Sequence, residues 1–507
     1  MLILAVPTLL TLRISSIDAA IVAVYLMIIT GIGFWVGRGN KTVSDYLLGD
    51  RSLPWWAVLG SIVATETSTA TFLSVPGTAF IEGGNLQFLQ LVLGFCLGRV
   101  LVAIFLIPLY FHGKLFTAYE VLHKRFGGVT RKTASLIFLL TRNLGDGLRL
   151  FLAGIVVEKI SGISLPLGIM IVGLSTIAYT FVGGMKAVIW SDCIQLLIYV
   201  SGGLIALMLI LQMLPGGWSE LMSYAESHNK LSCFDSGIDG SRPYSMFINF
   251  TKANTLLAGL IGGTLLSLGT HGTDQMMVQR YLCTASQRGA AKAVVLSGFV
   301  VFLQFALFLL LGIALAAFYA GIQDKPAFER SDEVFATFII EQMPVGLVGL
   351  MVAAVFSAAM STLSSSLNSS AGAVVNDFLT NVGTPKSQLR LSRVLTIVFG
   401  LLQIGLAIAA IQLQRSVIDN ALAIAGFSSG ILVGVFALGV LTQRVGQVSA
   451  MIGMIEGTMV LCMIKYWTQI AWPWYAPIGA AVTIAFGLIA SIAFDSNQRH
   501  GISKETG

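Results

Sequence analysis

One apolar stretch of the chain, GSIVATETSTATFLSVPG (residues 60–77), is rich in side chains that offer oxygen ligands. It contains four threonines, three serines and the ionisable Glu66. Because β-branched residues lower helix propensity and hydroxyls compete for backbone hydrogen bonds, we expect a helix to open here. An opened helix offers carbonyls to a cation and N–H groups to an anion. A Ser/Thr-rich face packed on a neighbouring helix explains this stretch equally well.

A second stretch, AAVFSAAMSTLSSSLNSSAGAVVNDF (residues 353–378), is also rich in small and hydroxyl residues. Four of them recur at i, i+3, i+4 and i+7, the spacing of one helical face: Ala358, Ser361, Thr362 and Ser365. Adjacent hydroxyls suit a hard monovalent cation, which takes oxygen ligands. A packing seam of small residues explains the alanines, but it accounts less well for the hydroxyl run 361–366. The pattern therefore favours a cation site.

The composition indicates a membrane protein. Of the 507 residues, 56% are hydrophobic and 11% are charged, which is more apolar surface than a water-soluble protein of this length can bury. Apolar stretches of about 18 residues or more are typical of transmembrane helices, whereas barrel strands are short and alternate. The ninth stretch is too long for one span, so we expect it to bend or to extend into water. We predict an all-α integral membrane protein with about thirteen spans: 16–37, 52–80, 86–112, 131–160, 163–183, 187–213, 253–280, 288–320, 332–377, 388–413, 417–442, 447–467 and 471–494.

The net charge of +6 is distributed as expected for a membrane topology rather than for a nucleic-acid surface. With the amino terminus outside, the inner loops carry 18 Lys and Arg residues and the outer loops carry 8. This asymmetry follows the positive-inside rule. It predicts a multi-pass protein of the cell inner (plasma) membrane, in contact with the lipid bilayer, with a cytoplasmic carboxyl terminus and no nucleic-acid partner. No obligate protein partner is evident.

Two of the predicted spans contain residues that interrupt helices. The second span holds the hydroxyl-rich stretch, and the seventh holds SLGTHGTDQMMVQR (residues 267–280), with glycines among polar residues. The two are five spans apart, so they cross the membrane in opposite directions, as in inverted-repeat transporters. The loop 214–252 is expected to be a polar connector, and 113–130 a short interfacial helix. We predict a single transporter domain made of a peripheral first helix (16–51), repeat 1 (52–213), repeat 2 (253–442), peripheral helices (447–494) and a cytoplasmic tail (495–507).

The chain resembles the sodium/solute symporter family over nearly its whole length. The stretch 60–77 is similar to the broken first core helix of that family, and 353–378 to its sodium-binding eighth core helix. Three further motifs follow the family order: TAYEVLHKRFG (117–127), FVGGMKAVIWSDCIQ (181–195) and DQMMVQRYLCTAS (274–286). The resemblance implies a bacterial member with a LeuT-like fold, a core of 5+5 inverted repeats with broken first and sixth core helices.

The resemblance also implies ion sites. The main sodium site of the family corresponds here to three carbonyls and two hydroxyls, those of Ala64, Thr67 and Ala358 and those of Ser361 and Thr362. A second sodium site, found in part of the family, corresponds to Asp192, Ser364 and Ser365. A carboxylate inside a span costs about 2.5–3.5 kcal/mol and is usually functional. Interfacial solvation or capping by Asp192 is the alternative. One or two co-transported Na⁺ ions are therefore expected.

Solute-binding positions follow from the same resemblance. The sugar branch of the family has an aromatic gate where this chain has Thr270, and amides where it has Thr71 and Ser267, so a sugar is disfavoured. Glu66 stands where the proline branch has an acid, and either ion-site charge or a structural hydrogen bond explains it. The family's substrate positions correspond to Ser68, Thr71, Gln90, Ser267 and Thr270.

The stretch TRNLGDGLRLF (residues 141–151) places three charged side chains on one face of the fourth span. Arg142, Asp146 and Arg149 stand at i, i+4 and i+7. If Arg142 and Asp146 neutralise each other, Arg149 is left to hold an acidic substrate. A purely structural charge network is an equally good explanation.

Together these features predict a sodium-coupled symporter that imports a small polar solute by alternating access. The solute could carry a carboxylate. The alternatives are a sodium/sugar symporter of the same family and a membrane sensor that keeps the fold but does not transport. No nucleophile–base constellation indicates an enzyme, and no catalytic residue is predicted.

Overall fold

The computed structural model describes residues 14–112, 115–238, 249–322, 328, 330, 331, 333–379, 384–413 and 415–495, without the side chains of residues 70 and 415–426. The amino terminus, predicted to lie outside, and residues 496–507 of the predicted cytoplasmic tail lie outside this part. The described residues form helices joined by turns and loops, and Leu53 and Thr284 pair in an isolated β-bridge. The all-α prediction is confirmed.

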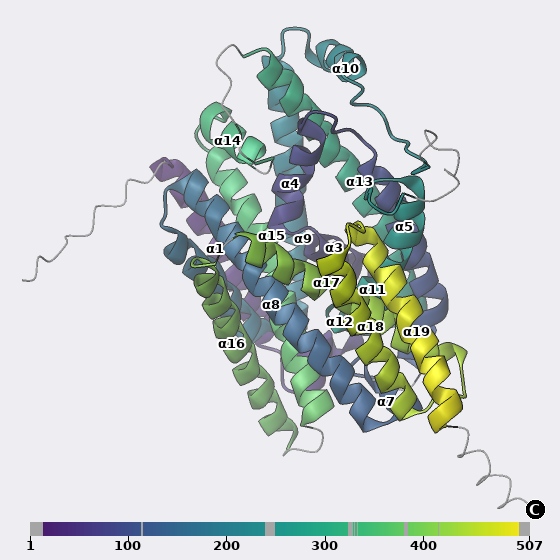
Figure 1. The fold of residues 1–507 in the computed structure, drawn as a ribbon. Coiled ribbons are helices and arrows are strands. Elements are labelled where there is room, and N and C mark those ends of the chain that lie inside the picture. The colour runs from purple at the N-terminus through teal and green to yellow at the C-terminus, as the bar shows by residue number, and fades with distance from the viewer. Residues whose placement is uncertain are drawn as a thin grey trace, which may run out of the picture.

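The helices run alongside one another in a bundle, with α10 and α14 at one end and α7 at the other (Figure 1). Five short irregular helical segments supplement them: η1 (Gly49–Arg51), η2 (Val102–Leu106), η3 (Ala258–Gly263), η4 (Val374–Phe378) and η5 (Trp472–Trp474). The helices are α1 (Ser16–Gly37), α2 (Val43–Leu48), α3 (Trp55–Glu66), α4 (Thr69–Phe80), α5 (Phe88–Leu101), α6 (Ile107–Phe111), α7 (Glu120–Phe126), α8 (Gly128–Ser161), α9 (Leu165–Met213), α10 (Gly217–Ser227), α11 (Thr264–Gly272), α12 (Gln275–Leu282), α13 (Gln287–Ala320), α14 (Glu333–Gln342), α15 (Leu347–Ala373), α16 (Pro385–Ala410), α17 (Arg415–Leu441), α18 (Gln447–Trp467) and α19 (Tyr475–Phe494).

Eight helices of the described residues are long and apolar enough to cross a membrane, or nine if the bent pair α3–α4 counts as one span. The count of about thirteen spans therefore stays a prediction. One of the eight, α9, covers two predicted spans and would measure about 74 Å if straight, more than twice the hydrocarbon thickness. It is interrupted at Gly184, whose φ of 58° and ψ of −157° suit only glycine. A Cβ there would lie 2.4 Å from the carbonyl oxygen of Tyr46.

Three segments of the chain can be compared with their predictions in more detail. The predicted ninth span consists of two helices, α14 and α15, separated at Gly346 with a φ of 92°. The loop 214–252 is not only a polar connector, because it contains the helix α10, which buries Leu221 and Ala225. This amphipathic pattern was hidden among the Gly, Ser and Pro residues of the loop. The segment 113–130 contains the short helix α7, as expected.

The helix α15 forms the centre of the core. Nearly all of its side chains are buried, and it packs against α1, α3, α8, α9 and α16. Its small residues allow this close approach. The hydroxyl-rich face predicted for residues 358–365 is therefore enclosed by protein.

Candidate functional site

A cavity of about 430 Å³ lies between the two interrupted helices, α3–α4 and α11–α12. Aromatic side chains of α5 and α13 form part of its wall, including Phe88, Phe95 and Phe305. Such a mixture of apolar walls and a few polar groups is typical of small-molecule sites. The polar lining consists of Thr65, Glu66, Ser68, Thr71, Thr141, Arg142, Arg149, Ser267, Thr270, His271, Asp274, Thr362, Ser428 and Ser429.

The first break lies between α3 and α4, which are bent by 60°. In an unbroken helix the N–H of Ser68 would donate to the carbonyl of Ala64, but here it donates to the carbonyl of Glu66 at 3.1 Å. The hydroxyl of Thr362 on α15 donates to the carbonyl of Thr65 at 3.1 Å. The hydroxyl-rich stretches 60–77 and 353–378 therefore meet at the break.

The second break separates α11 from α12 at Thr273 and Asp274. The carboxylate of Asp274 accepts a hydrogen bond from the backbone N–H of Met276 at 2.8 Å and caps α12. The N–H groups of Thr273 and Asp274 both donate to the carbonyl of Gly269. Helix interruption at both predicted places agrees with the local sequence signals.

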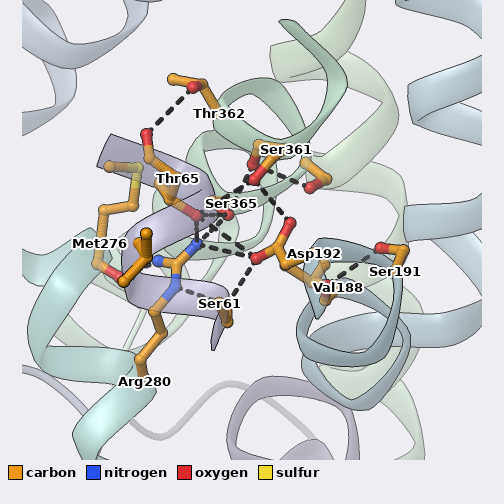
Figure 2. Close-up of polar contacts among 12 residues, drawn as sticks. Ser61, Thr65, Val188, Ser191, Asp192, Met276, Arg280, Ser361, Thr362 and Ser365 are labelled. Atoms are coloured by element: carbon orange, nitrogen blue, oxygen red, sulfur yellow. Dashed lines mark hydrogen bonds and ion pairs between the residues drawn. The ribbon is translucent and has the colours of Figure 1, made fainter. Parts of the chain in front are cut away.

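Asp192 of α9 lies at the centre of a buried polar cluster (Figure 2). Its Oδ2 accepts a hydrogen bond from the Ser61 hydroxyl at 2.5 Å, and its Oδ1 accepts one from the Ser361 hydroxyl at 2.7 Å. Since the side chain is fully buried, interfacial solvation does not account for it. The carboxylate is instead shared between α3 and α15.

Arg280 of α12 supplies the cation of this cluster (Figure 2). Its guanidinium donates to the hydroxyls of Ser61, Thr65 and Ser365, and NH2 lies 3.4 Å from Asp192 Oδ2. No role was predicted for Arg280 from the sequence. The signal in the sequence was that Arg280 is a second charged residue, after Asp274, close to the second break. Its partners could not be inferred from the sequence, because they come from three other helices.

The two predicted sodium sites adjoin each other. Ser361, assigned to the main site, binds Asp192 of the second, while Thr362 is directed to the first break. The hydroxyl of Ser364 and that of Ser365 donate to the carbonyl of Ser361 at 3.1 and 2.8 Å.

The remaining main-site residues lie beside the first break. Ala64 and Ala358 are fully buried, and the carbonyl of Ala358 lies 3.4 Å from the Thr362 hydroxyl. The hydroxyl of Thr67 donates to the carbonyl of Val63 at 2.9 Å. The predicted sodium ligand of Thr67 is its own backbone carbonyl, which takes no part in this hydrogen bond.

Glu66 lies at the cavity wall and is paired with Arg99 of α5. Arg99 is fully buried and also approaches His271 Nε2 at 3.1 Å and the hydroxyl of Ser297 at 3.1 Å. The other ring nitrogen of His271 lies 3.1 Å from the hydroxyl of Tyr281. Glu66 therefore belongs to a network that links α3, α5, α11 and α13.

The charges on α8 pair differently from the predicted arrangement. Asp146 contacts Arg149 at 2.5 Å and Arg142 only at 3.7 Å, and Arg142 pairs with Asp274. Arg149 is therefore itself the nearer partner of Asp146, and the predicted neutral pair of Arg142 with Asp146 does not account for its charge. The i, i+4 rule missed this because Asp274 approaches from a distant part of the chain.

The predicted solute-binding residues separate into two groups. Six line the cavity: Glu66, Ser68, Thr71, Arg149, Ser267 and Thr270. Gln90 is not among the lining residues. Its amide donates to the carbonyl of Asn254 at 2.9 Å, and its oxygen accepts from the N–H of Asp235 at 3.2 Å.

Similarity to known proteins extends over almost the whole chain. The family model described as "Sodium:solute symporter family" matches residues 46–457. The sodium/sialic acid symporter SiaT of Proteus mirabilis is 27% identical, over 94% of this chain and 95% of its own. The sodium/glucose cotransporter of Vibrio parahaemolyticus is also 27% identical, over 96% of this chain and 93% of its own. A solved structure of a Na⁺-coupled sialic acid symporter in a substrate-bound outward-open state superposes with a TM-score of 0.85 at 27% identity, covering 95% of this chain and 98% of that chain.

Proposed function

Because the chain belongs to the sodium:solute symporter family, we propose that it imports a small organic acid, a solute with a carboxylate group, together with sodium. Membership makes it a multi-pass membrane transporter with a LeuT-like inverted-repeat fold and sodium as the coupling ion. The family is one of transporters and not of enzymes. The inference that the solute has a carboxylate group rests on one observation: the partly exposed side chain of Arg149 lines the cavity.

Two features of the wall favour an anion. The side chain of Arg149 is 38% exposed, whereas that of its partner Asp146 is fully buried, so a solute meets the guanidinium first. The N-terminus of α4 is capped by Ser68, which lines the same cavity, and its helix dipole adds partial positive charge. Ser68 and Arg149 share a smaller pocket with Ala358 and Thr362, so the carboxylate would lie near the proposed main sodium site.

The names of the relatives alone do not select the solute. A sialic acid symporter and a glucose cotransporter are equally identical to this chain, and one carries an acid while the other carries a neutral sugar. The charges of the cavity favour the acid. A neutral sugar is the second candidate, since hydroxyl side chains such as Thr71 and Thr270 can bind sugar hydroxyls.

The sodium ligands proposed for the main site are the carbonyls of Ala64, Thr67 and Ala358 and the hydroxyls of Ser361 and Thr362. Asp192, Ser364 and Ser365 would hold a second ion once the guanidinium of Arg280, which pairs with Asp192 and donates to Ser365, has moved away, because it disfavours a second cation beside this carboxylate. An anion that enters with two sodium ions carries one net positive charge inward, so transport would be electrogenic. A membrane potential of about 100 mV then adds about 2.3 kcal/mol to the sodium gradient.

We further propose that one repeat moves against the other around this midplane site, which gives alternating access. The protein would lie in the cell inner (plasma) membrane with its amino terminus outside and its carboxyl terminus in the cytoplasm, as the positive-inside asymmetry favours. The partners that this activity requires are the lipid bilayer, the organic solute and sodium ions.

Uptake into proteoliposomes tests the proposal. Radiolabelled N-acetylneuraminate, D-gluconate and D-glucose are each supplied with an inward sodium gradient and, as a control, with an equal potassium gradient. The proposal expects sodium-dependent accumulation of at least one acid, faster than that of glucose. Arg149→Gln should reduce acid uptake strongly, and Arg149→Lys should reduce it less because the charge remains.

Each of the other outcomes has a definite meaning. Sodium-driven accumulation of glucose alone would replace the acid by the sugar candidate. Sodium-dependent binding without accumulation of any solute would favour a sensor that retains the fold.

A further inference from the structure

The two carboxylate oxygens of Glu66 have different surroundings. Oε2 accepts a hydrogen bond from Arg99 NH2 and lies 3.6 Å from His271 Nε2. Oε1 accepts no hydrogen bond from any residue in the part of the chain that the structure describes. The Glu66 side chain is 20% exposed and lines the cavity. One oxygen of a charged group is therefore held by the protein, and the other is available to a solute.

Arg99 holds this carboxylate in place. Its guanidinium is fully buried and is fixed by the Ser297 hydroxyl at 3.1 Å and by His271 at 3.1 Å. A side chain whose partners are locked in this way loses little conformational entropy when a ligand binds. Glu66 is thus preorganised as a hydrogen-bond acceptor.

The neighbouring hydroxyls of the cavity are weaker acceptors. Ser267 donates to the carbonyl of Phe95 at 3.0 Å, and Thr270 donates to the carbonyl of Ser267 at 3.4 Å. Their remaining lone pairs are neutral, whereas a hydrogen bond to a carboxylate is charge-assisted and roughly twice as strong. Compared with these hydroxyls, Glu66 Oε1, which accepts no hydrogen bond from a described residue, is therefore the stronger acceptor.

The charge of Arg99 limits what Oε1 can accept. The Arg99–Glu66 pair has no net charge, and the guanidinium beside the carboxylate disfavours a second cation. A neutral O–H donor is not subject to this repulsion. We infer that Glu66 Oε1 binds a hydroxyl group of the solute, in the cavity where Arg149 binds its carboxylate. The transported solute is then a hydroxy acid, an assignment that rests on the proposed acid transport.

Binding of a matched set of acids tests the assignment. D-Gluconate, hexanoate and 6-aminohexanoate share a carboxylate and chain length, and they differ in carrying hydroxyls, no donor, or an ammonium group. Their affinities for the purified full chain are measured by calorimetry in sodium, with potassium as the control. We expect gluconate to bind about tenfold more tightly than hexanoate, as one charge-assisted hydrogen bond allows. The affinity of 6-aminohexanoate should not exceed that of hexanoate.

Two variants separate the roles of the charged groups. Glu66→Asp keeps the charge opposite Arg99 but withdraws the oxygen, so the gluconate-to-hexanoate affinity ratio should fall to about one. Arg149→Gln should weaken both acids and leave that ratio near its original value. If Glu66→Asp does not fold, the charge-balanced double variant Glu66→Leu/Arg99→Leu, which removes both the carboxylate and its cation, provides the same comparison.

Three results would overturn the assignment. A ratio that survives in Glu66→Asp would remove Glu66 from hydroxyl recognition while leaving acid transport intact. Preference for 6-aminohexanoate over gluconate would make the donor an ammonium group. If none of the acids binds more tightly than sorbitol, acid transport itself fails, and the hydroxy-acid assignment fails with it.

Discussion

At the break between α3 and α4 the following helix is capped by a neutral hydroxyl, whereas at the break between α11 and α12 it is capped by a carboxylate that also forms an ion pair. At the first, Ser68 caps α4 and Thr362 donates to the carbonyl of Thr65. At the second, Asp274 caps α12 and pairs with Arg142 of α8. Corresponding positions of the two predicted repeats therefore have different chemistry.

This difference has a physical consequence. A neutral hydrogen bond contributes about 1 kcal/mol and is easily exchanged for a contact with an ion or a solute, whereas a charged group in a poorly solvated place is costly to leave unpaired. We interpret the first break as the one that responds to ligands and the second as its support. Arg280 joins them, because it lies on α12 and donates to Ser61 and Thr65 of α3.

The largest effect on stability is expected at the contact between Arg280 and Asp192. Arg280→Gln leaves the fully buried Asp192 without its cation, and breaking a buried pair costs about 3–5 kcal/mol. We expect a large fall in the unfolding temperature of the purified protein in potassium. The double variant Asp192→Asn/Arg280→Gln should recover most of the loss, because no charge then remains unpaired.

Sodium sharpens this comparison. If Asp192 can bind an ion, sodium should stabilise Arg280→Gln more than it stabilises the unmodified protein, and Asp192→Asn should lower the Hill coefficient for sodium towards one. Equal stabilisation of both proteins by sodium, or a stoichiometry of one sodium per solute in the unmodified protein, would speak against the second ion.

A smaller effect is expected at the second break. Asp274→Ala removes both the cap of α12 and the partner of Arg142, for a total of about 2 kcal/mol, and Asp274→Asn should recover about 1 kcal/mol because asparagine also caps helices. Chemical denaturation of the purified protein measures both. If the two variants are equally stable, the cap contributes nothing and charge alone holds α12.

The sequence predicts those parts of the site that depend on local pattern. Runs of β-branched hydroxyl residues and closely spaced glycines predict the two breaks, and helical spacing brings Ser361, Thr362 and Ser365 to one side of α15. These features follow from propensity and periodicity, which act over a few residues.

The pairing of charges could not be predicted in this way. Arg99 meets Glu66, Arg142 meets Asp274 and Arg280 meets Asp192 only through tertiary packing, across at least 33 residues of chain. The local i, i+4 rule instead suggests Arg142 with Asp146. The helix α10 was missed for a related reason, since only Leu221 and Ala225 reveal its buried side.

An intermediate effect is expected for the sodium ligands of the first break. Ser361→Ala and Thr362→Ala each remove one oxygen, so we expect the sodium concentration for half-maximal uptake to rise about tenfold, equivalent to about 1.4 kcal/mol. Ser369→Ala is a matched control, because its buried hydroxyl on the same helix donates to the carbonyl of Ser366 and contacts neither Asp192 nor the first break in the described part of the chain. Unchanged sodium curves in both test variants would show that the main site lies elsewhere.

The smallest effect on solute affinity is expected when the cap of α4 is made acidic, like the cap of α12. Aspartate caps helices as well as serine does, so Ser68→Asp should leave the stability of the protein nearly unchanged. Its carboxylate would nevertheless occupy the positive end of α4 that we assign to the solute. Charges at a helix end are worth about 0.3–1 kcal/mol, so the affinity for a carboxylate solute should fall about two- to fivefold.

A neutral control separates charge from shape in this last variant. Ser68→Asn has nearly the same size and caps helices equally well, so it should keep more of the acid affinity than Ser68→Asp does. Raising the salt concentration at constant sodium should narrow the gap between the two variants, since part of the repulsion acts through water. If both variants bind the acid equally, the N-terminus of α4 does not face the carboxylate, and Arg149 alone must account for any preference for acids.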